Sequence, residues 1–450
     1  MLKHWRRFRW SPPRILAAGF AVIIFLGAVL LSMPFASRDG SGTPFIDSLF
    51  TATSATCVTG LISVDTGSHY STIGHLIIIF LIQIGGLGFM TVATLFAFML
   101  RKKISFKERL VLQEAMNQGS IEGIVRLVRK VLLYSLTIEA VGAVLFTIRW
   151  SFDMPLAKAI FFGCWHAISM FNNAGFDLFG QFGTPFVSFT AYTSDPLVNL
   201  VTMGLIILGG LGFIVLSDII EYRVKRKLSL HSKIVLTMTA ALILIGAIVT
   251  YCFEFSNPHT LGALSWDGKI WAAFFQSVSP RTAGANTVDL SSLRQATQFF
   301  MVVLMFIGAS PGSTGGGIKT TTFATLIGAV ITMIRGREDI VMFKMRLGRE
   351  RILKALTITM LALALVIVVT MLLTVTEDKP FLHLLFETTS AFGTVGLSLG
   401  VSPELTLLGK VLVCLTMFAG RLGPLTLAYA LGSTTDKELY RYPEGKITIG

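Results

Sequence analysis

Four short segments that each end in glycine recur at intervals of roughly 110 residues. An aromatic residue precedes each final glycine by ten positions, and the segments occupy residues 54–60, 169–175, 278–284 and 390–396. Glycine alone reaches a positive φ without steric cost, so its neighbouring carbonyl can turn in directions that other residues resist. Four such carbonyls facing one axis would be ligands for a cation. The repetition therefore predicts four repeats of one ion-binding unit.

The composition places these segments in a membrane. Of the 450 residues, 53% are hydrophobic and only 14% are charged, and the mean hydropathy is +0.71. This leaves too little polar surface to coat a soluble protein of this size. Four cysteines without Cys-x-x-Cys spacing favour neither a disulfide framework nor a zinc site.

Two kinds of apolar segment alternate along the chain. Eight are long enough to cross a bilayer, at about 15–35, 73–100, 131–148, 197–220, 234–253, 296–309, 355–375 and 405–430. Four shorter ones lie between the members of each pair, at about 44–54, 156–170, 268–278 and 380–391. These are too short to span and are interpreted as half-helices that enter the membrane and turn back. The predicted fold is an all-α membrane protein with four pseudo-repeats of helix, re-entrant pore loop and helix around one pore. The repeats are expected at 1–100, 101–222, 223–335 and 336–450, the last with a cytoplasmic tail.

The net charge of +13 follows membrane orientation and does not indicate nucleic acid as a partner. Residues 1–14, 101–130, 222–233, 335–354 and 436–450 together contain 28 of the 38 lysines and arginines. By the positive-inside rule, both termini and the loops between repeats are predicted to be cytoplasmic. Basic, amphipathic loops on that side are expected to contact a protein partner or anionic membrane lipids.

A non-helical strand at membrane depth persists only if protein buries it or if it faces water, because unpaired backbone groups in lipid are costly. Rings of backbone carbonyls can replace the hydration shell of a monovalent cation. No acidic residue flanks the four glycines, which argues against divalent selection, and a glycine in every repeat favours potassium. The predicted ion-binding residues are Val58, Thr59, Gly60, Asn173, Ala174, Gly175, Thr282, Ala283, Gly284, Thr394, Val395 and Gly396. For any one glycine, ordinary helix packing is the simpler explanation, but four in register favour a filter.

With these segments and the Gly-Gly-Leu-Gly-Phe runs at 85–89 and 209–213, the chain resembles the membrane subunit of the Ktr/Trk/HKT superfamily of potassium transporters, of the bacterial Ktr type. The resemblance covers nearly the whole chain. It implies a multi-pass protein of the bacterial plasma membrane, a homodimer with a pore in each subunit, and a separate cytosolic ring of nucleotide-binding regulatory subunits. In plant relatives a serine in place of the first filter glycine accompanies sodium permeation, so Gly60 supports potassium.

The third repeat contains a sequence that cannot remain helical. Proline and repeated glycine interrupt its second helix, and each glycine costs about 1 kcal/mol relative to alanine in a helix. A polar loop at this depth must border water, and the family resemblance agrees that an intramembrane loop lies here. The predicted gate comprises Gly308, Ala309, Ser310, Pro311, Gly312, Ser313, Thr314, Gly315, Gly316, Gly317, Lys319 and Arg421. A phosphate-binding loop is disfavoured because Ile318 separates the glycines from Lys319 and no strand precedes them. A simple kink remains the alternative.

Three cations lie deep in the apolar segments, where a charge usually marks a cavity, a partner or a function. Lys319 is expected either at the inner pore or extended to the interface. Arg421 is interpreted either as a barrier or tether of the loop or as a structural donor to backbone carbonyls. Arg281 is expected to point away from the axis and to hold its segment in place. Buried Glu139 and Glu387 are expected to form hydrogen bonds that fix the scaffold.

The sequence favours potassium uptake through a gated pore with no tightly bound cofactor, and it leaves the dependence on sodium open. Transport of sodium or ammonium is the alternative. A membrane enzyme would need convergent His, Asp or Glu, whereas the seven histidines are dispersed. A solute transporter is expected to have paired broken helices, and only one helix is predicted to be broken.

Overall fold

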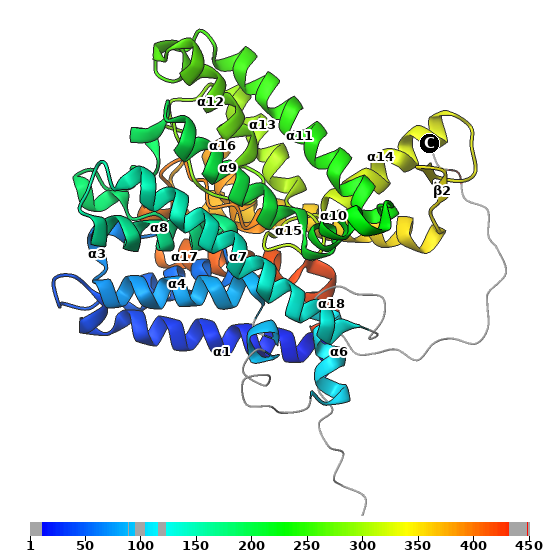
Figure 1. The fold of residues 1–450 in the computed structure, drawn as a ribbon, viewed down its shortest axis with the longest axis horizontal. Coiled ribbons are helices and arrows are strands. Elements are labelled where there is room, and N and C mark those ends of the chain that lie inside the picture. Colours follow the sequence, from blue (N-terminus) through cyan, green and yellow to red (C-terminus); the bar gives the residue numbers. More distant parts are fainter. Residues whose placement is uncertain (1–10, 89, 95–103, 116–122, 432–447, 449–450) are drawn as a thin grey trace, which may run out of the picture.

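The computed structural model describes residues 11–88, 90–94, 104–115, 123–431 and 448. The predicted basic terminus at 1–14 and tail at 436–450 lie almost entirely outside these residues, as does part of the 101–130 loop. The chain is overwhelmingly helical, and Figure 1 shows long helices that run side by side across the molecule.

Among the residues that the structure describes, four unbroken helices are long and apolar enough to cross a membrane, one near the start of each predicted repeat. Their outward faces are apolar: Phe25 is 57% exposed and Val375 is 86% exposed. Exposed apolar side chains of this kind are expected to face lipid tails. The four helices are α1 (Pro12–Ser32), α7 (Ile124–Trp150), α11 (Leu230–Glu254) and α15 (Arg349–Thr376).

A shorter helix follows each long one. Proline stands at the N-cap of three of them, where it has no N–H to leave unsatisfied and its φ is already fixed. At 1.5 Å per residue, 13 to 16 residues cover only part of a bilayer. These pore helices are α2 (Phe45–Cys57), α8 (Leu156–Phe171), α12 (Trp266–Val278) and α16 (Phe381–Gly393).

The second long segment is interrupted in the second, third and fourth repeats. The two halves meet at 100° in the second repeat and at 96° in the fourth. The prediction of a single broken helix is therefore wrong, because a positive-φ glycine, Gly212 or Gly423, is enough to turn the chain. The helices are α4 (Thr72–Leu87), α9 (Pro196–Leu211) with α10 (Phe213–Lys225), α13 (Gln295–Ile307) with α14 (Thr320–Ile334), and α17 (Leu407–Leu422) with α18 (Pro424–Leu431).

The repeats pack in a closed ring. Each pore helix lies against the second helix of the preceding repeat: α8 against α4, α12 against α9, and α16 against α13. The ring closes because α2 of the first repeat lies against α17 of the fourth. The loops that follow the pore helices must therefore meet near one axis.

The remaining elements lie at the two ends of the helices. They are η1 (Pro34–Ala36), α3 (Thr66–His69), α6 (Phe106–Ala115), η2 (Phe179–Phe182), η3 (Thr190–Tyr192), η4 (Leu261–Ala263), η5 (Ser402–Glu404) and a hairpin of β1 (Val341–Met342) and β2 (Met345–Arg346), with Val341 paired to Arg346.

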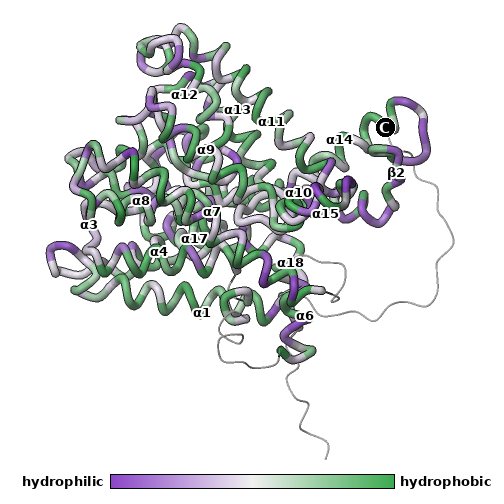
Figure 2. The backbone as a smooth tube through the Cα atoms, in the orientation of Figure 1, coloured by the Kyte–Doolittle hydropathy of each residue, from purple (hydrophilic) through white to green (hydrophobic). Residues whose placement is uncertain are grey.

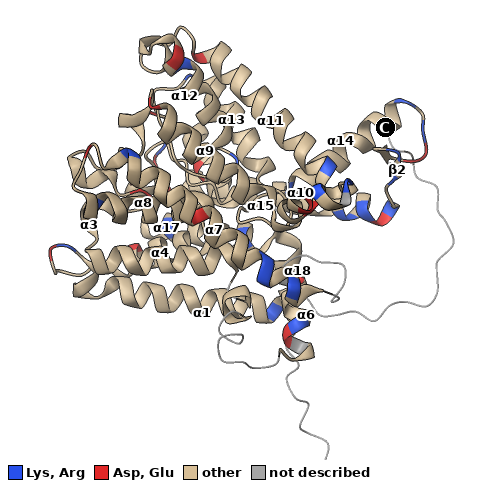
Figure 3. Ribbon diagram, viewed as in Figure 1, with Lys and Arg blue, Asp and Glu red and all other residues tan. Residues whose placement is uncertain are grey.

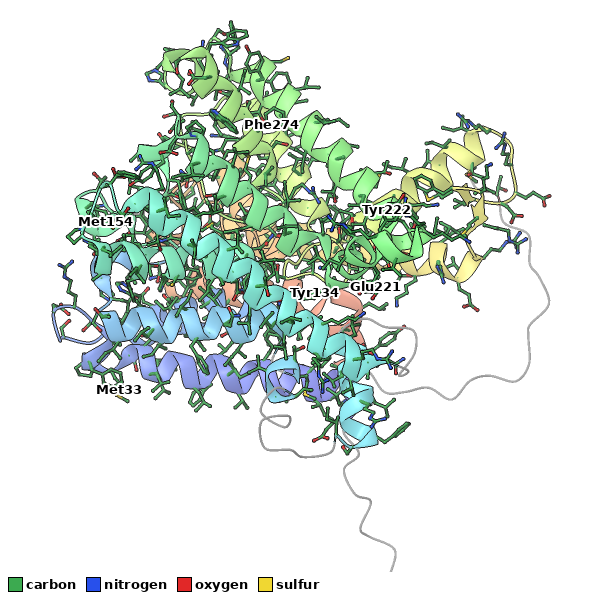
Figure 4. All side chains as sticks on the ribbon, viewed as in Figure 1. Met33, Tyr134, Met154, Glu221, Tyr222 and Phe274 are labelled. Atoms are coloured by element: carbon green, nitrogen blue, oxygen red, sulfur yellow. The ribbon has the colours of Figure 1, made fainter. Side chains whose placement is uncertain are left out.

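The two ends of the molecule differ in charge. Figure 2 shows green, apolar helices along most of its length, and Figure 3 shows that lysine and arginine gather toward the end with α6, α10 and β2. In Figure 4, Met33 and Met154 lie toward the opposite end from Tyr222 and Glu221. Glu221 forms a salt bridge with Lys130, within the basic end. We refer to the basic end as the inner end and to the other as the outer end.

Candidate functional site

The four glycine-ended segments meet in one ring. A Cβ atom built on Gly60 would lie 2.4 Å from the carbonyl oxygen of Ala174, and one built on Gly175 would lie 2.5 Å from that of Ala283. The pattern continues around the ring: Gly284 faces the oxygen of Val395 at 2.5 Å, and Gly396 faces that of Thr59 at 2.2 Å. Each repeat thus touches the next, and the fourth touches the first. A side chain at any of the four positions would collide with backbone.

The same backbone conformation occurs four times. The final glycines have φ between 70° and 96°, and the residue two positions earlier is also left-handed in every repeat, although it is not glycine. Left-handed backbone is uncommon for valine and threonine and costs about 1–2 kcal/mol. These residues are Val58 (φ 58°), Asn173 (60°), Thr282 (79°) and Thr394 (48°). A strained conformation in all four repeats indicates a shared requirement on where the carbonyls point.

Serine hydroxyls hold these loops in place, a role that the sequence analysis did not assign. Ser54 Oγ accepts a hydrogen bond from the Gly60 amide at 3.0 Å, and Ser390 Oγ accepts one from the Gly396 amide at 3.1 Å. Ser169 Oγ instead donates to the Phe176 carbonyl at 2.7 Å. A serine stands near the start of each segment, and serine side chains commonly form hydrogen bonds with nearby backbone groups, so the sequence could have indicated this role.

The interrupted segment of the third repeat lies directly under this ring, on the side of the left-handed residues. Thr314 Oγ1 donates to Asn173 Oδ1 at 3.2 Å, and the Gly316 amide donates to Thr394 Oγ1 at 2.8 Å. A Cβ on Gly315 would lie 2.1 Å from Thr282 Oγ1. We call residues 308–317 the intramembrane loop; it contacts the glycine-ended segments of three repeats.

The intramembrane loop is also bonded to the bend of the second repeat. The Ser310 amide donates to the Gly210 carbonyl at 3.0 Å, and the Phe213 amide donates to the Gly312 carbonyl at 3.0 Å. Within the loop, Ser313 Oγ donates to the Ser310 carbonyl at 2.6 Å. The loop is therefore an ordered element whose backbone bonds are shared with a neighbouring repeat.

Both deep cations at the inner side bond to this loop. Lys319 Nζ donates to the Gly315 carbonyl at 2.6 Å and lies 3.3 Å from that of Gly316, so it folds back onto the loop and does not extend to the interface. The Arg421 guanidinium donates to the Thr314 carbonyl on the loop and to the carbonyls of Gly85 and Gly86 on α4. Arg421 thus joins three repeats through backbone acceptors.

The other buried charges lie behind the ring. Arg281, in the third glycine-ended segment, donates to the carbonyl and hydroxyl oxygens of Thr239 at 3.3 and 3.4 Å and so joins that segment to α11. Glu139 accepts hydrogen bonds from Gln83 and Asn172 at 3.0–3.2 Å. Among the described residues, no three His, Cys, Asp or Glu side chains lie close enough together to hold a metal ion.

A short pattern explains how the second helices approach the ring. Gly-x-Leu-Gly occurs at 85–88, 209–212 and 420–423. A Cβ on Gly85, Gly209 or Gly420 would lie 1.9–2.0 Å from a carbonyl oxygen at the end of the pore helix of the same repeat. The first glycine therefore permits close packing, and the last, Gly212 or Gly423, bends the helix in the second and fourth repeats. Arg421 occupies the second position of the fourth-repeat copy.

A ring of four re-entrant segments between apolar helices is typical of a multi-pass membrane protein. A family model described as a cation transport protein, TrkH, matches residues 3–435. Over 446 residues the chain is 45% identical to the Ktr system potassium uptake protein B of Bacillus subtilis, covering 99% of this chain and 98% of that one. It is 40% identical to the potassium/sodium uptake protein NtpJ of Enterococcus hirae, covering 100% of both.

The fold is similar to the crystal structure of the potassium transporter TrkH from Vibrio parahaemolyticus, with a TM-score of 0.73 at 17% identity, covering 95% of this chain and 86% of that one. The chain belongs to the TrkH family of cation transport proteins. It is a transport protein and not an enzyme.

Proposed function

We propose that the chain conducts potassium into the cell through the ring formed by residues 58–60, 173–175, 282–284 and 394–396. The carbonyls before the glycines replace the hydration shell of the ion, as in other carbonyl-lined filters. The observation that carries this proposal is the cyclic approach of Gly60, Gly175, Gly284 and Gly396, each against the carbonyl of the next repeat. The membrane potential drives entry of the ion and supplies a free energy of about 2.3 kcal/mol per charge for each 100 mV.

Potassium is favoured over sodium because glycine stands at all four positions and because relatives at 41–45% identity are named for potassium uptake. Sodium is the second candidate, since the Enterococcus hirae relative is named for both ions. Neither a tightly bound cofactor nor a resident metal is required for conduction.

We propose further that the intramembrane loop is the gate. It lies in contact with Asn173 and Thr394 beneath the ring, where an ion leaving the filter would meet it. Arg421 bonds to the loop and to α4, so it tethers the loop in the position described here. Lys319 adds a second positive charge beside the same path.

A cytosolic nucleotide-binding regulatory subunit is the proposed controller of this gate, on a homodimer of the chain with both termini cytoplasmic. The gathering of lysine and arginine at the inner end supports the orientation by the positive-inside rule. The relatives' names describe lettered proteins of a Ktr system, which fits a protein with further components.

The filter proposal is tested by rubidium flux into liposomes with sodium as competitor. The native protein is compared with Gly60→Ser and Gly284→Ser. Both substitutions place a Cβ within 2.5 Å of a neighbouring carbonyl, so we expect the preference for rubidium over sodium to fall. Unchanged preference in both variants would overturn the filter.

A further inference from the structure

A polar cavity at the outer end has no role in the pathway. It lies between the beginnings of α4 and α8, away from the ring, and its volume is about 560 Å³. Arg38, Ser71, Thr72 and His75 line it from the first repeat, and Lys158 and Phe161 line it from the second. This volume lies in the range of small-molecule sites.

The two cations of this cavity have no acidic partner. In the part of the chain that the structure describes, no carboxylate lies within salt-bridge distance of Arg38 or Lys158. The Lys158 ammonium group lies 4.2 Å from the ring centroid of Phe182, which orients it without neutralising it. Asp65 is nearby, but it does not line the cavity and its carboxylate accepts hydrogen bonds from Ser68 and the Phe186 amide. The cavity therefore favours an anion.

Apolar surface continues from the cavity toward the middle of the membrane. Ile73, Leu76 and Phe80 on α4 are each more than half exposed, and their spacing of three and four residues places them on one face. On α8, Leu156 is 62% exposed and Ile160 is 47% exposed. The cavity lies where both helices begin, at the level expected for lipid headgroups, and the apolar faces extend below it. A ligand suited to both parts has an anionic head and hydrocarbon chains.

We propose that this cavity binds an anionic phospholipid of the outer leaflet. The phosphate lies between Arg38 and Lys158, and the acyl chains follow the exposed faces of α4 and α8. Because Arg38 belongs to the first repeat and Lys158 to the second, the lipid bridges the two repeats. The bridge reaches the pore scaffold, since the His75 carbonyl on the cavity wall accepts a hydrogen bond from Trp165 Nε1 at 3.1 Å. The bound lipid thereby stabilises the packing of the first two repeats.

The test uses native mass spectrometry of the full-length protein with equal amounts of phosphatidylglycerol and phosphatidylcholine. Arg38→Gln, Lys158→Gln and the double variant are compared with Lys269→Gln. Lys269 is a matched control because it also lies near the start of a pore helix, with its ammonium group 4.4 Å from the ring centroid of Phe255, but it does not line the cavity. Gel filtration and rubidium flux establish that each variant is folded.

We expect the native protein and Lys269→Gln to retain phosphatidylglycerol in preference to phosphatidylcholine. Each cavity substitution should reduce retention about fivefold, the contribution of one basic residue near an anionic headgroup. Added phosphatidylglycerol should raise the melting temperature of the native protein more than that of the double variant. Equal retention in the double variant and the native protein would overturn the proposal. Displacement of the lipid by millimolar glycerol phosphate would also overturn it, because the cavity would then bind soluble phosphates.

Discussion

The second helix is interrupted differently in the third repeat than in the other repeats. In the second and fourth repeats one residue, Gly212 or Gly423, turns the chain by about a right angle. In the third repeat, residues 308–319 separate α13 from α14. All three interruptions follow the helix that lies beside the pore helices. A position that is a simple bend elsewhere has become a loop that reaches under the ring.

This difference separates two roles. In the proposed filter each repeat must supply the same carbonyl to one axis, which requires fourfold similarity. The backbone angles of the four segments do agree from repeat to repeat. A gate needs no symmetry, because one element can obstruct one pathway. The third repeat can therefore depart from the pattern at its second helix while retaining Thr282 and Gly284 in the common conformation.

The largest expected effect comes from breaking the fourfold ring. Gly175→Ala places a methyl group 2.5 Å from the Ala283 oxygen at a φ of +70°. Such backbone strain costs about 1–3 kcal/mol, and we expect rubidium flux to fall at least about tenfold. The matched control is Gly204→Ala in α9 of the same repeat, where no atom lies within 4 Å of the added methyl. Normal flux through Gly175→Ala would show that the ring is not required.

The sequence predicted the ring of glycine-ended segments better than the helix bends at Gly212 and Gly423. Four glycines at similar spacing, each after an apolar half-helix, indicate a backbone conformation that glycine adopts most readily. The helix spans followed from apolar length alone. Gly212 and Gly423 were harder to interpret, because a single glycine within an apolar run is equally compatible with close helix packing. The Gly-x-Leu-Gly pattern shared by three repeats was the signal that separates these cases.

The contacts of the cations could not be predicted from the sequence. Hydropathy indicates that Arg421 is deep in the membrane, but not which acceptors it reaches. Its partners on the intramembrane loop and on α4 are more than 100 and 300 residues away in the chain. Only the closure of the ring brings these elements together. Arg281 bonds within its own repeat, to Thr239 on α11, and hydropathy does not identify this acceptor either.

The second prediction concerns the intramembrane loop, which distinguishes the third repeat from the others. Deletion of residues 312–316 takes away the backbone that contacts Thr282 and Thr394. We expect rubidium flux in the absence of a regulatory subunit to rise about tenfold. A tenfold change corresponds to the free energy of about one to two hydrogen bonds that stabilise a closed state. Ser313→Ala is the control, because the hydrogen bond that Ser313 Oγ donates stays within the loop, to the Ser310 carbonyl. Flux that stays the same or falls in the deletion would refute the gate.

The third prediction concerns Arg421, which can be replaced while the intramembrane loop is left intact. Arg421→Gln removes a charged donor from the Thr314 and Gly85 carbonyls, so the loop should leave its position more often. We expect flux in liposomes to rise about threefold or more. Arg294→Gln serves as the control, since Arg294 bonds to Ser256 at the outer end. A drop in flux with normal stability would instead assign Arg421 a role in conduction.

The smallest effect is expected at the helix bends, where two glycines with similar backbone strain can be compared. Gly212 and Gly423 have φ of 91° and 85°, so alanine should cost about 1–2 kcal/mol at either. A methyl group on Gly212 would lie 2.6 Å from the Pro311 oxygen of the intramembrane loop, whereas one on Gly423 meets nothing. Gly212→Ala should change flux by about twofold to threefold, and Gly423→Ala should change only the melting temperature. Equal effects on flux would mean that strain, and not contact with the loop, controls the gate.

The central claim is that four backbone carbonyls, one from each repeat, hold the ion. The most direct measurement is a crystal structure of the full-length protein grown with rubidium, with anomalous scattering used to locate the ion. We expect an anomalous peak on the axis of the ring, equidistant from the carbonyls of Thr59, Ala174, Ala283 and Val395. An empty ring with rubidium bound elsewhere in the membrane would contradict it.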